Sequence, residues 1–142
     1  MTQSFTPVVT SAVAGLGFRQ QTSPQALRQV LDAALAAARQ GGAELSLRAL
    51  AAADDKCQHP ALVQLATDLA LPLQPVPPPL LVAQDAQPSA HVPARYGARS
   101  LAEAAALAAA GPGAVLASRR HVSADGSATA AIAVKTSQSL TP

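Results

Sequence analysis

Aromatic side chains are scarce in this sequence of 142 residues, which has no tryptophan and only Phe5, Phe18 and Tyr96. Proteins that bind single-stranded nucleic acids commonly combine stacking aromatics with a basic groove. Here ten Lys and Arg residues are scattered among eight Asp and Glu, and the net charge is only +2. We therefore expect no nucleic-acid partner.

Cysteine is almost absent as well. Cys57 is the only one, which excludes an internal disulfide and the thiolate-rich zinc sites. The three histidines are separated in the sequence and complete no recognisable zinc-ligand spacing with it. We expect neither a bound metal nor another cofactor.

Long apolar runs are also missing, because the longest stretches fall short of the roughly 18 residues that a membrane span needs. The apolar segment 7–17 precedes the first basic residue, Arg19, whereas a secretory signal has its cationic region first. We expect a cytoplasmic protein without a membrane partner.

Alanine is abundant, with 35 residues, about a quarter of the chain. Hydrophobic residues make up 49% and charged residues only 13%, the opposite of the balance typical of disordered chains. The length fits a single domain, residues 1–142, with one core. Because few bulky side chains can fill gaps, the layers of this domain must pack closely.

The first half of the sequence alternates strand and helix patterns. Residues 7–17 are apolar, rich in β-branched side chains and closed by two glycines, which predicts a buried strand. Ser23 followed by Pro24 is typical of a helix start, and Gly41-Gly42 of its end. Similar arguments predict a helix beginning at Pro60 and strands at 47–53 and 71–76.

The second half begins with a proline-rich loop at 75–97. Ser100 and Glu103 form the Ser-x-x-Glu pattern of a capping box, which opens an alanine-rich helix ending at Gly111. Strands at 114–119 and 127–135 meet at an Asp125-Gly126 turn, and 136–142 form a C-terminal tail. This order predicts an α/β fold, a three-layer α/β/α sandwich with a mixed sheet of about five strands.

A candidate site lies beyond the carboxyl ends of the first two strands, where open α/β sheets bind their ligands. At the end of the first strand and just after it, its residues are Gly15, Gly17, Arg19, Thr22 and Ser23. Backbone N–H groups, a helix N-terminus and a guanidinium together suit an anion. If the two strands are parallel neighbours, Lys56 reaches the same rim. The alternative is an ordinary turn with a solvated arginine, since the third glycine of a dinucleotide fingerprint is missing.

Other polar residues have two interpretations each. Asp55 either holds Lys56 or acts as a base. We interpret Cys57 as an ordinary thiol; the alternative is a reactive one, because a neighbouring lysine can lower a thiol pKa. His59 precedes a proline and fits a helix N-terminus. Ser100 and Glu103 need no ligand as a capping box, and residues 119–121 (Arg-Arg-His) are interpreted as a solvated loop.

Four segments together resemble the family of CobE proteins and CbiG C-terminal domains of cobalamin biosynthesis. They are GLGFRQQTSPQAL at 15–27, AADDKCQHPALVQLA at 52–66, SLAEAAALAAAG at 100–111, and LASRR with ATAAIA within 116–133. The family's first motif commonly reads Gly-x-Gly-Cys-Arg-Arg-Gly-Thr. Phe18 stands here for the cysteine and Gln20 for the second arginine, while Arg19 and Thr22 match. The family's Asp-Lys pair matches Asp55 and Lys56, and its serine and glutamate match Ser100 and Glu103.

The resemblance implies a role in corrin-ring synthesis, with a precorrin or corrin intermediate as the ligand. The ligand-binding residues are then Gly15, Gly17, Arg19, Thr22, Ser23, Asp55, Lys56, Ser100 and Glu103. Precorrins are flat apolar macrocycles ringed by carboxylates, which suits a rim of cations and N–H groups. Two alternatives stay open. One is a precorrin lactone hydrolase like CbiG with Asp55 or Glu103 as the catalytic residue, and the other an accessory subunit that binds another pathway enzyme.

Overall fold

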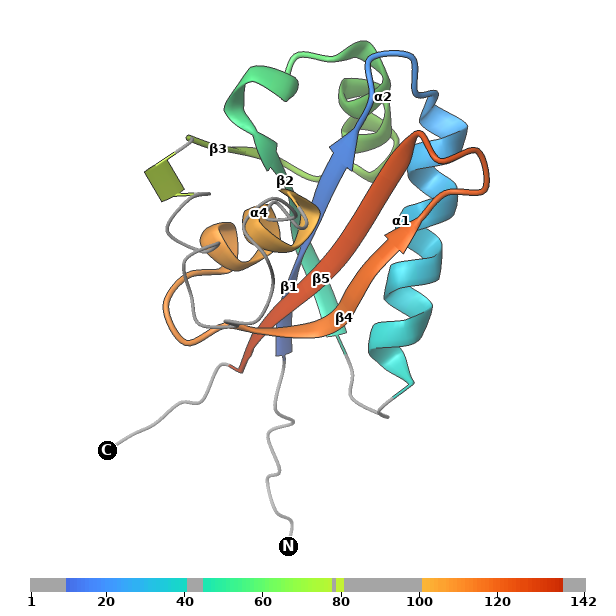
Figure 1. Ribbon diagram of the computed structural model, residues 1–142. Coiled ribbons are helices and arrows are strands. Elements are labelled where there is room, and N and C mark those ends of the chain that lie inside the picture. Colours follow the sequence, from blue (N-terminus) through green and yellow to red (C-terminus); the bar gives the residue numbers. More distant parts are fainter. Residues whose placement is uncertain (1–9, 41–44, 78, 81–100, 137–142) are drawn as a thin grey trace, which may run out of the picture.

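The computed structural model describes residues 10–40, 45–77, 79–80 and 101–136, and the predicted elements are present in the predicted order (Figure 1). The strands are β1 (Thr10–Phe18), β2 (Leu45–Ala53), β3 (Leu73–Val76), β4 (Val115–Val122) and β5 (Ala128–Thr136). The helices are α1 (Pro24–Arg39), α2 (Pro60–Leu69) and α4 (Leu101–Ala110), with a short 3₁₀ turn, η1, at Asp54–Lys56. The proline-rich loop beyond residue 80, the residue Ser100 of the expected capping box and the tail beyond 136 lie outside the described residues.

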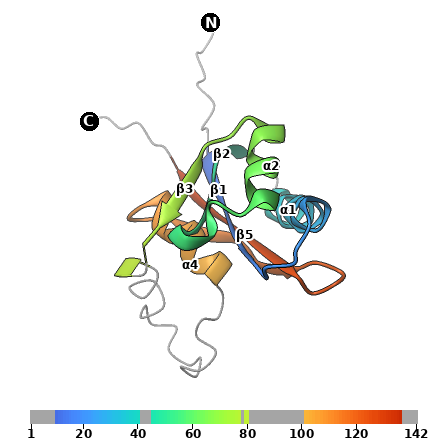
Figure 2. The same ribbon diagram turned by 90° about the horizontal axis from the view of Figure 1, so that it is seen from above.

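The five strands form one mixed sheet in the order β3-β2-β1-β5-β4. β1, β2 and β3 are parallel, whereas β5 is antiparallel to both β1 and β4. Helices α1 and α2 pack on one face of the sheet and α4 on the other, as the view from above shows (Figure 2). The predicted three-layer α/β/α arrangement is therefore confirmed.

Several strand boundaries differ from the sequence prediction; β2, for example, begins at Leu45 rather than residue 47. β3 begins at Leu73 rather than residue 71, because α2 ends in a left-handed residue, Ala70 at φ 57°, whose turn includes Leu71. The solvated loop expected at 119–121 is wrong, since β4 continues to Val122. The hairpin turn needs only residues 123–127, because its own side chains complete the hydrogen bonding there.

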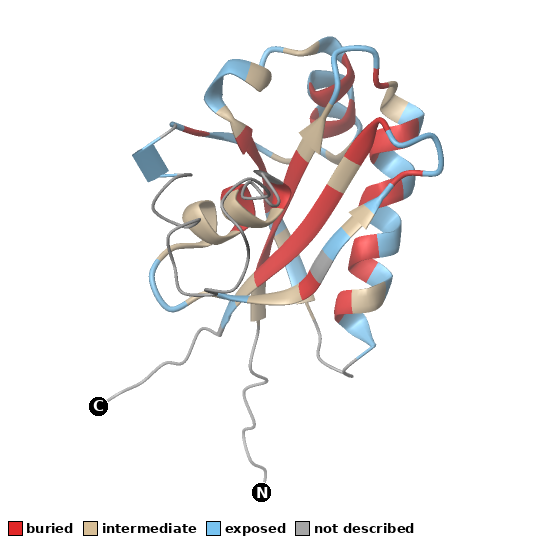
Figure 3. Cartoon of the chain, in the orientation of Figure 1, coloured by how far each residue is buried: buried red, intermediate tan, exposed pale blue. Residues whose placement is uncertain are grey.

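The larger part of the core lies between the sheet and helices α1 and α2. Its fully buried large side chains include Leu16, Leu27, Leu31, Leu50, Leu62, Leu65 and Ile132. The buried residues run along the middle of β1 and β5 and along one side of α1 (Figure 3). The apolar residues of α1 recur every three or four positions, and the side of the helix that they form is the buried one.

The α4 face of the sheet packs through small side chains. Ala102, Ala105 and Ala106 are buried, and α4 lies so close to β1 that Gly15 is in contact with it. A Cβ atom at Gly15 would collide with the carbonyl oxygen of Ala102. The start of α4 thus faces the carboxyl end of β1, and its last turn lies near the beginning of that strand.

Candidate functional site

Arg19 and Lys56 lie at the same end of the sheet. Arg19 follows the last residue of β1, and Lys56 closes η1 directly after β2. The two strands are parallel neighbours, with Gly15 opposite Ala51, so their carboxyl ends meet at one edge of the domain. We call the residues 18–20 and 54–59 at this edge the carboxyl rim.

Phe18 is the centre of the carboxyl rim. The ammonium nitrogen of Lys56 lies 5.5 Å from the centroid of the Phe18 ring, within the range of a cation–π interaction. The ring of His59 meets the same phenyl ring edge-on, with centroids 5.0 Å apart and an angle of 75° between the planes. The Phe18 ring thus contacts side chains from the segment after β2 on two sides.

His59 is the N-cap of α2, as its place before Pro60 predicts. Its Nδ1 accepts a hydrogen bond from the backbone N–H of Ala61 at 3.0 Å. Its Nε2 therefore carries the proton and donates to the carbonyl oxygen of Gln20 at 2.7 Å. Both ring nitrogens are engaged, and the side chain ties the two segments of the rim together.

Cys57 belongs to the rim, and its sulfur lies 3.6 Å from the carbonyl oxygen of Ala53. Burial and the neighbouring carboxylate of Asp54 raise the pKa of this thiol. A thiol with a raised pKa is mostly protonated at neutral pH and is a poor nucleophile. These contacts agree with the interpretation of Cys57 as an ordinary thiol.

Gly15, Thr22 and Ser23 have packing and capping contacts that account for them within the fold. Gly15 lies beneath α4. Ser23 is the N-cap of α1, and its hydroxyl accepts from the N–H of Ala26 at 3.1 Å. Thr22 is only 6% exposed, and its hydroxyl lies 2.9 Å from that of Ser127 in the hairpin turn. Their ligand-binding roles remain predictions.

The hairpin turn braces the segment that carries Arg19. The N–H of Arg19 donates to the carbonyl oxygen of Ser127 at 2.8 Å. One carboxylate oxygen of Asp125 accepts from the hydroxyl of Ser123 and from the N–H and hydroxyl of Ser127, at 2.7–2.9 Å. These hydrogen bonds lower the pKa of Asp125 to about 2. The sequence marks this turn by Asp125-Gly126 but does not show that it supports the rim.

The two candidate bases lie on different elements. Asp55 is exposed in η1 on the rim. Glu103 lies in the first turn of α4, and its carboxylate accepts from the backbone N–H of Arg120 in β4 at 3.1 Å. Gly17, the last of the predicted strand-end residues, lies in β1 and accepts from the hydroxyl of Thr129 through its carbonyl oxygen.

A pocket lies at the opposite end of the sheet from the carboxyl rim, and sequence reasoning missed it. Ser11, Arg48, Gln74 and Lys135 line a pocket of about 450 Å³ there. The one signal available was a charged residue, Arg48, within an otherwise apolar strand pattern.

Metal-ligand clusters and membrane-spanning helices are both absent from the part of the chain that the structure describes. In that part of the chain, no group of three or more His, Cys, Asp and Glu side chains is placed to hold a metal ion. None of the described helices is long and apolar enough to span a membrane.

Comparison of this chain with known proteins identifies the family to which it belongs. Residues 12–133 match the family model described as Cobalamin synthesis G C-terminus. The crystal structure of CobE, a protein from the cobalamin (vitamin B12) biosynthetic pathway, is 35% identical over 94% of this chain and 96% of that one, with a TM-score of 0.72. The cobalamin biosynthesis protein chiG from Agrobacterium tumefaciens is also 35% identical, over 86% of this chain and 96% of that one, with a TM-score of 0.62.

A comparison with curated protein sequences gave no match. The family model nevertheless covers most of the chain, and the similarity to CobE extends over nearly all of both chains. The chain therefore belongs to the CbiG C-terminal/CobE family of cobalamin biosynthesis proteins.

Proposed function

We propose that this protein binds a precorrin or corrin intermediate at the carboxyl rim. The observation that carries the proposal is the position of the Lys56 ammonium over the Phe18 ring. Phe18 directly precedes Arg19 in the chain, so both cations lie next to the same aromatic side chain. Both cations follow parallel strands at one edge, and Arg19 is exposed. A flat apolar macrocycle with peripheral carboxylates needs an apolar surface together with nearby cations, and the rim offers both.

Binding is favoured over catalysis by the contacts of the possible bases. His59 uses Nδ1 as a cap and Nε2 as a donor to Gln20, so neither nitrogen is available to take a proton from water. The Glu103 carboxylate already accepts a backbone hydrogen bond from β4. Asp55 is an exposed carboxylate at the edge of the rim. The cations and the aromatic ring together can hold a ligand, whereas the two carboxylates lie on different elements. We therefore favour a binding role.

The direct test is retention of the pigment. The protein is mixed with individual precorrin intermediates, and the visible absorbance that co-elutes on gel filtration is measured. Arg19→Ala and Lys56→Ala should each weaken binding by about ten- to hundredfold, the value of a hydrogen bond to a charged group. Arg39→Ala is the matched control, because Arg39 is an exposed cation in the last turn of α1, away from the rim. If both rim variants retain the pigment as the parent does, the proposal is wrong.

A gain-of-function variant complements these losses. Gln20 is exposed, and His59 contacts only its backbone carbonyl among the described interactions. Gln20→Arg therefore adds the second cation of the family motif without removing that hydrogen bond. We expect tighter pigment binding and a steeper loss of affinity with added salt, since charges at an exposed rim are screened. Mass spectrometry of the released pigment distinguishes binding from catalysis, and an unchanged mass supports a binding role.

A further inference from the structure

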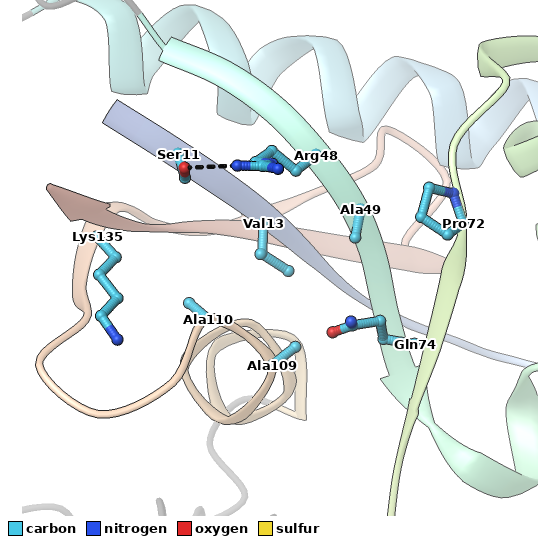
Figure 4. A pocket seen from close by; sticks show the side chains of 9 residues that line it. All are labelled: Ser11, Val13, Arg48, Ala49, Pro72, Gln74, Ala109, Ala110 and Lys135. Carbon is cyan, nitrogen blue, oxygen red and sulfur yellow. Dashed lines mark hydrogen bonds between the residues drawn. The ribbon is translucent and has the colours of Figure 1, made fainter. Parts of the chain in front are cut away.

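The pocket at the amino ends of the parallel strands combines two cations with an apolar wall (Figure 4). It lies between the sheet and the last turn of α4, and its volume is about 450 Å³. Val13 and Ala49 form part of the sheet side, and Ala110 is on the helix side. A pocket of this size accommodates a small organic molecule.

A β-bulge places Arg48 at this pocket. Ala12 is opposite Leu47 and Val13 is opposite Ala49, so Arg48 is an extra residue in β2. Leu50 faces the apolar core on the α1 and α2 side. Side chains of a regular strand alternate between the two faces of the sheet, so Arg48, two residues before Leu50, would face the same core. The bulge instead puts two successive residues, Arg48 and Ala49, on the pocket side. Bulges commonly re-aim a side chain in this way next to functional sites.

Ser11 lies between the two cations. The guanidinium of Arg48 donates to the hydroxyl of Ser11 at 3.2 Å. On the other side, Lys135 in β5 is the register partner of Ser11. The Lys135 ammonium also lies near Gly111 at the end of α4, where a positive charge is favourable. Within the described residues, neither Arg48 nor Lys135 is paired with a carboxylate, and the pocket lining contains no Asp or Glu.

The positions of the two cations indicate which anion fits. Arg48 and Lys135 come from the strands on either side of β1, and their charged groups have different neighbours: the guanidinium hydrogen-bonds to Ser11, whereas the ammonium lies near Gly111. Two cations held at separate points suit two anionic groups joined by a short apolar chain better than one compact phosphate. We propose that this pocket binds a small aliphatic dicarboxylate, with one carboxylate at Arg48 and the other at Lys135. The site is separate from the carboxyl rim and goes beyond the function proposed there.

Titration with glutarate tests the proposal, followed by the backbone amide signals of the ¹⁵N-labelled protein. Glutarate should cause saturable shifts at residues around the pocket, including Ala49 and Ala110. Arg48→Gln and Lys135→Gln should each weaken binding about tenfold or more. Arg39→Gln, on the opposite face of the sheet, and Lys56→Ala, at the carboxyl rim, should leave it unchanged. Inorganic phosphate should bind more weakly than glutarate.

A second variant distinguishes binding within the pocket from non-specific attraction of an anion to the two cations. Ala110→Leu keeps both cations but fills the space beside them, and it should abolish glutarate binding, whereas Ala36→Leu on the exposed side of α1 should not. Lys135→Arg keeps the charge near the end of α4, and it should retain binding. The proposal is overturned if glutarate gives no saturable shifts, if phosphate binds as tightly, or if Arg39→Gln weakens binding as much as Arg48→Gln does.

Discussion

The hydroxyls of Thr22 and Ser127 are 2.9 Å apart in the interior, although 105 residues separate them in the chain. This buried contact joins the segment after β1 to the turn of the β4–β5 hairpin. Because the same turn accepts the N–H of Arg19, the position of a candidate ligand-binding cation depends on the last part of the sequence. The rim is thus assembled by the packed domain rather than by a local motif.

Thr22→Val should lower the free energy of unfolding by about 1–2 kcal/mol. The substitution preserves the shape of the side chain but removes one partner of a buried hydrogen bond. Urea denaturation followed by circular dichroism measures the change. Thr22→Ser keeps the hydroxyl and should recover part of the loss. Equal stability of Thr22→Val and the parent would show that the contact contributes nothing to folding.

Gly15→Ala should be more damaging, at about 3 kcal/mol, because the new Cβ would collide with the backbone of α4 near Ala102. Gly113→Ala is the control. A Cβ at Gly113 meets nothing within 4 Å, and only its positive φ of 86° makes the substitution unfavourable, by about 1 kcal/mol. Denaturation midpoints of the two variants should therefore differ clearly, and similar midpoints would argue against close packing of α4 on β1.

The carboxylate of Asp125 should make stability depend on pH in the acid range. Its pKa in the folded protein is about 2, below the ordinary value of 3.8, because the ionised form accepts three hydrogen bonds. The unfolded chain therefore binds a proton first as the pH falls, and the contribution of Asp125, complete above about pH 4, is lost toward pH 2. Asp125→Asn has no titrating group at this position. The stability difference between parent and variant, measured from pH 5 to pH 2, should shrink, and a constant difference would contradict the assignment.

His59→Ala should lower stability by about 1 kcal/mol, because the first turn of α2 loses the acceptor for the N–H of Ala61. Asn is a strong N-cap, so His59→Asn should recover most of that loss. Neither variant retains the imidazole donor to Gln20, and both should therefore loosen the rim. Chemical denaturation gives the stability, and backbone amide shifts of residues 18–22 report on the rim. The cap assignment fails if His59→Asn is no more stable than His59→Ala.

The order of the elements and the two helix starts at Ser23-Pro24 and His59-Pro60 could be predicted from the amino-acid sequence. These features depend on residues close together in the chain, such as a cap and the N–H groups it satisfies or apolar side chains at one period. Once β1 and β2 are parallel neighbours, the placement of Arg19 and Lys56 at one end of the sheet also follows from sequence order. Parallel strands joined by a helix bring their carboxyl ends to the same edge.

Contacts between segments far apart in the chain could not be predicted from the sequence. The bulge that re-aims Arg48 depends on the register between β1 and β2, and a pattern within one strand contains no information on its partner's register. The close approach of α4 to Gly15 and the hydrogen bond from Thr22 to Ser127 likewise require the packed domain. Periodicity shows which side of a strand or helix is buried, whereas the neighbour that covers it is chosen by packing over the whole chain.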